Sequence, residues 1–159
     1  MKTIGILLLF GVCTMLGLQA AKRLSARAKA IDALLASLES FLEQIQNGTP
    51  LRRAGGTSGA LGTAIGCYLD GLEQGNASDE AARTAAQGVD GVQAAEQAAL
   101  ASFLDGMEDV ERRTLLLRAD TLCTALGHAK TEADADAKKG RLYRSIGVLA
   151  GAGLAILLL

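Results

Sequence analysis

The stretch KKGRLYRSIGVLAGAGLAILLL, from Lys138 to Leu159, combines a basic cluster with an apolar run. Its cations are Lys138, Lys139, Arg141 and Arg144, and residues 145–159 carry no charge. As a helix this run extends about 22 Å, against roughly 30 Å for the hydrocarbon core of a bilayer. Basic side chains near a helix end reach back to the interface and lengthen the apolar part. We therefore predict a short transmembrane helix with a basic collar; the alternative is a buried helix of a soluble core.

The beginning of the chain repeats this pattern in reverse order. Residues 3–21 are uncharged, and a helix over residues 4–21 would extend about 27 Å. The basic residues that follow are Lys22, Arg23, Arg27 and Lys29. Because both apolar runs carry their cations toward the middle of the chain, the positive-inside rule places the middle in the cytoplasm. We predict a multi-pass protein of the cell membrane, with transmembrane helices at 1–21 and 145–159 and a cytoplasmic domain at 22–144.

A second interpretation of the first apolar run is a secretory signal peptide that is cleaved near Ala21. The product would be an exported or membrane-tethered helical binding protein. Two observations favour a retained anchor instead. The segment after the cleavage site is strongly basic, which opposes export, and one topology then satisfies the charges at both ends. The sequence of the mature N-terminus would distinguish the two interpretations.

Apolar residues from Ile31 to Ile45 recur at the spacing of one face of an α-helix, and Asn47-Gly48 is typical of a helix end. Pro50 favours a short helix at 51–54, which Gly55-Gly56 should break. A further helix capped by Thr57 or Ser58 should follow and end at Gly75. The larger apolar residues of this helix share one face; they are Leu61, Ile65, Tyr68, Leu69 and Leu72.

Residues 76–102 carry mostly alanine as apolar content. They predict two short, poorly buried helices, the first capped by Asn76 or Ser78, with Gly88 and Gly91 between them. Larger apolar residues return at Phe103, and we expect one long helix from there through Gly140 toward the membrane. No segment shows the alternation of a β-strand. The predicted fold is all-α, a cytoplasmic helical bundle between two single transmembrane helices.

The sequence does not assemble an active site. His128, the only histidine, has no partner at metal spacing and is expected to face solvent. Cys67 and Cys123 are isolated, so we expect buried free thiols and no zinc site or disulfide framework. Outside the collars no block is basic enough to indicate nucleic-acid binding. We expect no enzymatic activity, no cofactor and no small-molecule substrate.

Small residues on the last helix indicate close packing within a membrane. Gly147, Gly151 and Ala155 lie four residues apart and form a small-x-x-x-small ridge. The first helix carries a looser ridge of Gly11, Thr14 and Gly17. The two helices can pack against each other, or the ridges can meet another membrane protein.

The chain resembles the stage III sporulation protein AB family. The run YRSIGVL at residues 143–149, followed by Gly151 and a leucine-rich end, is similar to the closing motif of the family. The segment LEQIQNGTPL at residues 42–51 is similar to a second characteristic stretch. The alanine-rich residues 76–102 depart from the family pattern.

The resemblance implies a part in the channel complex that joins mother cell and forespore. The cytoplasmic domain of the family is similar to that of the inner-membrane platform protein of type II secretion and type IV pilus machines. The implied role is a scaffold that docks a cytoplasmic ATPase to membrane components of the same complex, with the middle domain on the mother-cell side.

Overall fold

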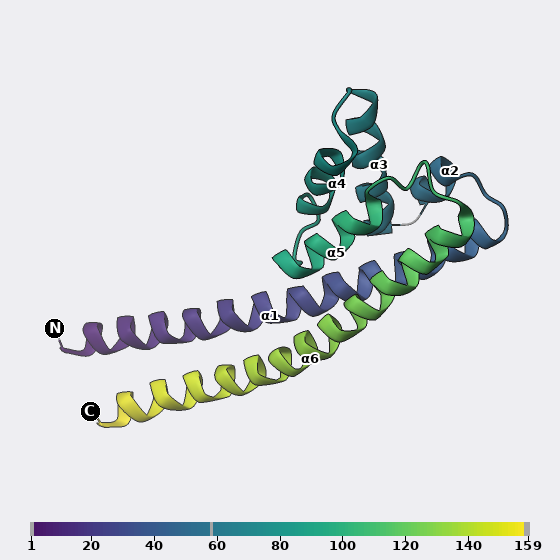
Figure 1. Ribbon diagram of the computed structural model, residues 1–159. Coiled ribbons are helices and arrows are strands. Elements are labelled where there is room, and N and C mark those ends of the chain that lie inside the picture. The colour runs from purple at the N-terminus through teal and green to yellow at the C-terminus, as the bar shows by residue number, and fades with distance from the viewer. Residues whose placement is uncertain (1, 58, 158–159) are drawn as a thin grey trace. The chain divides into compact units, whose positions relative to one another are not determined.

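The computed structural model describes the backbone of residues 2–57 and 59–157. It describes the surroundings of side chains at residues 22–56 and 59–140, and at Met15, Leu18, Gln19, Leu142 and Ser145. These residues form six α-helices and no β-strand, which confirms the all-α prediction for this part of the chain (Figure 1). The helices are α1 (Lys2–Gln46), α2 (Leu51–Thr57), α3 (Gly59–Glu73), α4 (Ser78–Gln87), α5 (Ala94–Leu104) and α6 (Arg112–Leu157).

The chain divides into two compact units, and α1 and α6 contribute a segment to each. We call Lys29–Lys130 the helical unit, and Met1–Ala28 with Thr131–Leu159 the terminal unit. The domain boundaries predicted after residues 21 and 144 lie inside α1 and α6, which are continuous there.

In the part of the chain whose side-chain surroundings are described, no helix has the length and apolar character needed to cross a membrane. The spans predicted at 1–21 and 145–159 lie almost entirely outside that part. The two transmembrane helices therefore stay a prediction.

The core of the helical unit forms where α1, α5 and α6 meet. The predicted apolar face of α1 is buried, and its largest residue, Phe41, is fully enclosed. Phe41 packs edge-to-face on Phe103 of α5, with ring centroids 6.2 Å apart. Within this unit α1 and α6 run antiparallel: Lys130 Nζ lies 2.5 Å from Asp32 Oδ1, and the Arg112 guanidinium donates to the carbonyl of Gln46. The other buried core residues of the two long helices are Ile31, Leu34, Leu38, Ile45, Leu115, Ala119, Leu122 and Leu126.

The glycines after α1 and α3 end these helices as predicted. Gly48 has φ +82°, its N–H donates to the carbonyl of Ile45, and the N–H of Thr49 donates to the carbonyl of Gln44. Gly75, with φ +86°, makes the same pair of bonds after α3. Both ends are Schellman motifs. A residue in the left-handed conformation there lets the N–H groups after the helix bond to its last unpaired carbonyls.

The prediction that Gly55-Gly56 breaks α2 is wrong, because the helix continues to Thr57. A Cβ atom on Gly55 would lie 2.7 Å from Cγ2 of Ile65, which is fully buried in α3. The missing side chain therefore lets α2 pack directly on α3, and this contact offsets the helix-propensity cost of about 1 kcal/mol per glycine. Thr57 is the last residue of α2 and not the cap of α3, and Ser58 lies outside the described residues.

The expectation of two short helices in residues 76–102 is confirmed, but the expectation that they are poorly buried is wrong. Four alanines of α4, Ala81, Ala82, Ala85 and Ala86, are at most 3% exposed. A Cβ atom on Gly71 of α3 would lie only 3.0 Å from Cβ of Ala81. Small side chains bury fully here because they allow the helix backbones to approach closely.

The helix expected to run on from Phe103 is interrupted. α5 ends at Leu104, and α6 begins at Arg112. Between them Gly106 adopts φ +64°, and Met107 is buried at 2% exposure. From Arg112 onward α6 runs through Gly140 as predicted.

Candidate functional site

Several collar residues of α1 and α6 lie in one compact unit. Lys22 and Arg23 of α1 are exposed in the terminal unit, as are Lys138 and Lys139 of α6. Lys29 is exposed and begins the helical unit. The side chains of Arg141 and Arg144 lie outside the described residues.

Acidic side chains of α6 lie closer to the collar than the sequence alone indicates. Arg27, whose side chain is 12% exposed, lies 4.0 Å from Glu132 Oε2, and Lys139 Nζ lies 3.4 Å from Asp136 Oδ1. The sequence indicates two separate collars, and it does not predict the ion pair that joins Arg27 of α1 to Glu132 of α6. The pair of Lys139 and Asp136 is exposed on both sides, and such pairs contribute little to stability.

The packing ridge at Gly147, Gly151 and Ala155 lies within α6. Contacts of these residues fall outside the part of the chain whose side-chain surroundings are described. Their role in helix packing stays a prediction.

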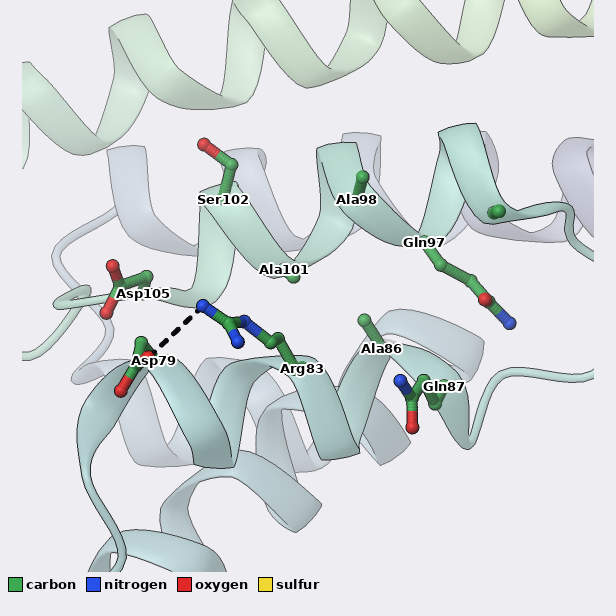
Figure 2. A pocket seen from close by; sticks show the side chains of 10 residues that line it. Asp79, Arg83, Ala86, Gln87, Gln97, Ala98, Ala101, Ser102 and Asp105 are labelled. Carbon is green, nitrogen blue, oxygen red and sulfur yellow. Dashed lines mark ion pairs between the residues drawn. The ribbon is translucent and has the colours of Figure 1, made fainter.

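A groove of about 480 Å³ lies between α4 and α5 in the helical unit (Figure 2). The two helices run antiparallel, with Ala86 of α4 and Ala98 and Ala101 of α5 along the groove. Asp79 and Asp105 lie at one end and the amides of Gln87 and Gln97 toward the other. The groove therefore has small apolar groups along its middle, an acidic end, and longer polar side chains beside them. Its remaining lining residues are Arg83, Ala94 and Ser102.

Ser78 fixes the acidic end of this groove. Its hydroxyl donates to Asp105 Oδ1 at 2.6 Å and accepts the N–H of Gly106 at 2.9 Å. The hydroxyl of Tyr68 in α3 lies 3.1 Å from Oγ of Ser78. Because a hydroxyl oxygen can accept two hydrogen bonds, Ser78 can accept one from Tyr68 as well. The expectation that Ser78 or Asn76 caps α4 is wrong, because Ala77 is the N-cap residue and makes no side-chain cap bond. Ser78 instead joins α3, α4 and the end of α5.

A second hydrogen bond to Asp105 comes from α6. Arg118 Nη1 donates to the backbone carbonyl of Asp105 at 2.6 Å. Asp105 is thus held through both its carboxylate and its carbonyl, while the residue as a whole stays exposed. The only signal in the sequence was the position of Ser78 and Asp105 at the ends of two neighbouring helices, which does not reveal the pairing.

The segment of the chain that contains the groove is rich in acidic residues. Residues 66–111 carry ten acidic side chains and one basic side chain, Arg83. Nine of the ten acids are exposed. The tenth, Glu96, is 4% exposed and accepts the backbone N–H of Gln93 in a capping box at the start of α5.

A second group of acids lies near Arg52 of α2. The hydrogen bond that the exposed Arg52 donates to Glu73, together with the charge of Glu73, raises the pKa of Arg52, and the charges of Glu108 and Asp70 act in the same direction. These acids come from α3 and from the turn after α5. They form an acidic cluster around Arg52.

The described residues offer no group of three or more histidine, cysteine, aspartate and glutamate side chains that could hold a metal ion. His128 is exposed, as predicted. Cys67 and Cys123 are free, but Cys67 is exposed and Cys123 half-buried, so the expectation of buried thiols is wrong. The described residues also form the groove between α4 and α5, with alanines along its middle and Asp79 and Asp105 at one end.

Comparison with known proteins gives one match. The family model described as stage III sporulation protein AB matches residues 2–159. No curated protein and no solved structure matches the chain. The family match confirms the resemblance carried by residues 42–51 and 143–151.

Proposed function

The chain belongs to the stage III sporulation protein AB family, and from this we propose that it is a non-enzymatic membrane scaffold of the channel between mother cell and forespore. Residues 1–21 and 145–159 anchor it in the mother-cell membrane, and the helical unit lies in the cytoplasm. There it docks an ATPase of the same secretion-like complex to the membrane components. The proposal includes no cofactor, no small-molecule substrate and no nucleic acid.

One observation carries the proposal: both connections from the helical unit to the apolar ends are helical. α1 has 45 residues and α6 has 46, and each continues from the core of the helical unit into the terminal unit without a loop. A flexible linker would separate a docked partner from the membrane segments. Continuous helices, with backbone hydrogen bonds throughout, connect the two mechanically.

Charge supports the same orientation. Exposed Lys22, Arg23 and Lys138 lie next to the apolar runs. Cations in such positions are attracted to the anionic headgroups of the cytoplasmic leaflet, by about 1 kcal/mol per side chain near the surface. Retention of these residues on the cytoplasmic side keeps the helical unit there as well.

The exposed thiol of Cys67 allows a direct test of topology. In a full-length chain with Cys13→Ser and Cys123→Ala, Cys67 is the one remaining thiol. A membrane-impermeant maleimide added to intact cells should leave it unlabelled and should label it after permeabilisation, with Cys67→Ser as the blank. Labelling in intact cells would place the helical unit outside and favour the exported binding protein.

The partner is tested in sporulating cells. A full-length chain tagged at its C-terminus is cross-linked in the cell, extracted in detergent and purified. We expect an ATPase and membrane proteins of the channel complex to be enriched relative to vegetative cells that express the same chain. Purification without any ATPase, after efficient cross-linking, would contradict the docking role.

A further inference from the structure

We propose that the groove between α4 and α5 binds a basic amphipathic helix of a cytoplasmic partner protein. This inference rests on the proposed function and deepens it, because it assigns the contact surface and the chemistry of the partner. Two independent features carry it: the shape and composition of the groove, and the charge of the surface around it.

The groove accepts a helix because alanines of two antiparallel helices line its middle. Ala98 is exposed and Ala101 half-buried along α5, and the buried Ala86 of α4 lines the same groove. Methyl groups leave room for the side chains of an incoming helix and bring its backbone close. An amphipathic helix that lays its apolar face in such a groove is a recurring mode of recognition.

The charge selects a basic helix. Asp79 and Asp105 lie at one end of the groove, where Arg118 of α6 also reaches the carbonyl of Asp105. The segment of residues 66–111, which contains the groove, carries ten acids and one basic residue, Arg83. Arg83 is already engaged, since its guanidinium lies 3.2 Å from Asp79 Oδ2. A partner with lysines along the border of its apolar face gains favourable interactions along the groove and a faster encounter, whereas an acidic partner is repelled.

The same charge disfavours a second copy of the chain as the occupant. A two-fold symmetric contact through this groove would bring two acidic surfaces together. The basic collars of another copy are confined, by the proposed topology, to the membrane boundary. The occupant is therefore a different protein with a basic helical segment.

The binding test uses the full-length chain in a zwitterionic detergent and a fluorescent helical peptide as probe. The peptide has about 18 residues, enough for measurable helicity, with an Ala/Leu face bordered by lysines. Two comparison peptides isolate the features that matter: one with glutamate in place of every lysine, and one with the same composition scrambled so that no apolar face forms. Binding is measured by fluorescence anisotropy at low and at physiological salt.

Two variants of the protein locate the binding surface. Ala98→Trp fills the groove at an exposed position, and Ala36→Trp places the same side chain at an exposed position of α1, away from the groove. We expect Ala98→Trp to weaken binding of the lysine peptide by at least about tenfold and Ala36→Trp to leave it unchanged. The glutamate and scrambled peptides should not bind measurably. Circular dichroism confirms that both variants keep their helix content.

Equal binding to the wild type and to Ala98→Trp would overturn the proposal, as would equal binding of the lysine and scrambled peptides. These failures differ from failure of the scaffold function. If the peptide result is negative while the ATPase still co-purifies, the groove assignment falls and the scaffold stands. Labelling of Cys67 in intact cells removes the scaffold whatever the peptides do.

Discussion

Two contact regions of the helical unit reach the same burial by opposite means. Where α1 meets α5 and α6, large side chains fill the space, as in the edge-to-face pair of Phe41 and Phe103. Where α4 meets α3, the buried residues of α4 are alanines, and Gly71 of α3 faces Ala81. In the first region large apolar side chains fill the space between the helices. In the second the helix backbones themselves lie close together. The two regions should therefore fail under opposite substitutions.

Removing a large side chain tests the first region and gives the largest expected effect. Phe41→Ala should lower the free energy of unfolding by about 3–5 kcal/mol, because it removes a fully buried ring and leaves a cavity. Urea unfolding of the full-length chain in detergent, followed by circular dichroism, measures the loss. The same truncation at the exposed Leu117 is the control and should cost far less. An equal cost at both positions would mean that the ring is not part of a packed core.

Adding a large side chain tests the second region. Ala81→Leu should destabilise the protein by about 3 kcal/mol, at the upper end of overpacking effects, because Cβ of Ala81 already lies against the backbone position of Gly71. Ala95→Leu makes the same change at an exposed position of α5 and should stay within about 0.5 kcal/mol. Tolerance of leucine at residue 81 would show that α3 and α4 have room to separate, and the contrast between the two regions would be lost.

This contrast also explains which parts of the fold the sequence predicts. The spacing of the apolar residues from Ile31 to Ile45 identified the buried face of α1, because large apolar residues at helical spacing form one face that packs against the core. Alanine carries no such signal, since it is common on exposed and buried faces alike. The burial of Ala81 and Ala85 depends on the partner helix, which the local sequence does not contain. The same holds for Gly55, whose role appears only when Ile65 is placed beside it.

The candidate site divides in the same way. The concentration of acids in the middle of the chain and the cations at its ends are properties of the sequence, and both were evident from it. The groove between α4 and α5 and the hydrogen bonds of Ser78 are not, because they join residues 27 and 28 positions apart. Nothing in the local pattern around Ser78 distinguishes a helix cap from a contact of this kind.

The region where α4 meets α3 also contains polar contacts, which Ser78 makes at the start of α4. Ser78→Ala should lower the free energy of unfolding by about 2 kcal/mol, because Tyr68, at 1% exposure, loses the partner of its hydroxyl, and the N–H of Gly106 loses its acceptor. Thermal and urea unfolding measure the loss. The double variant Ser78→Ala with Tyr68→Phe should cost less than the sum of the two single variants. Strict additivity would show that the two hydroxyls do not interact.

The smallest effect is expected at the exposed contact between α2 and α3, where Arg52 pairs with Glu73. The hydrogen bond that Arg52 donates to Glu73 raises the pKa of Arg52, so any stability from this shift is present at every pH below the ordinary value for arginine and is lost only as the pH rises through the raised value. Because the pair is exposed on both sides, solvent and salt screen it. Arg52→Gln should leave the urea midpoint unchanged between pH 6 and pH 9, at low and at high salt. A clear loss of stability at low salt alone would mean that the acidic surface around Arg52 repels itself strongly enough to need this cation, and the charged field would then belong to the account of stability as well as of binding.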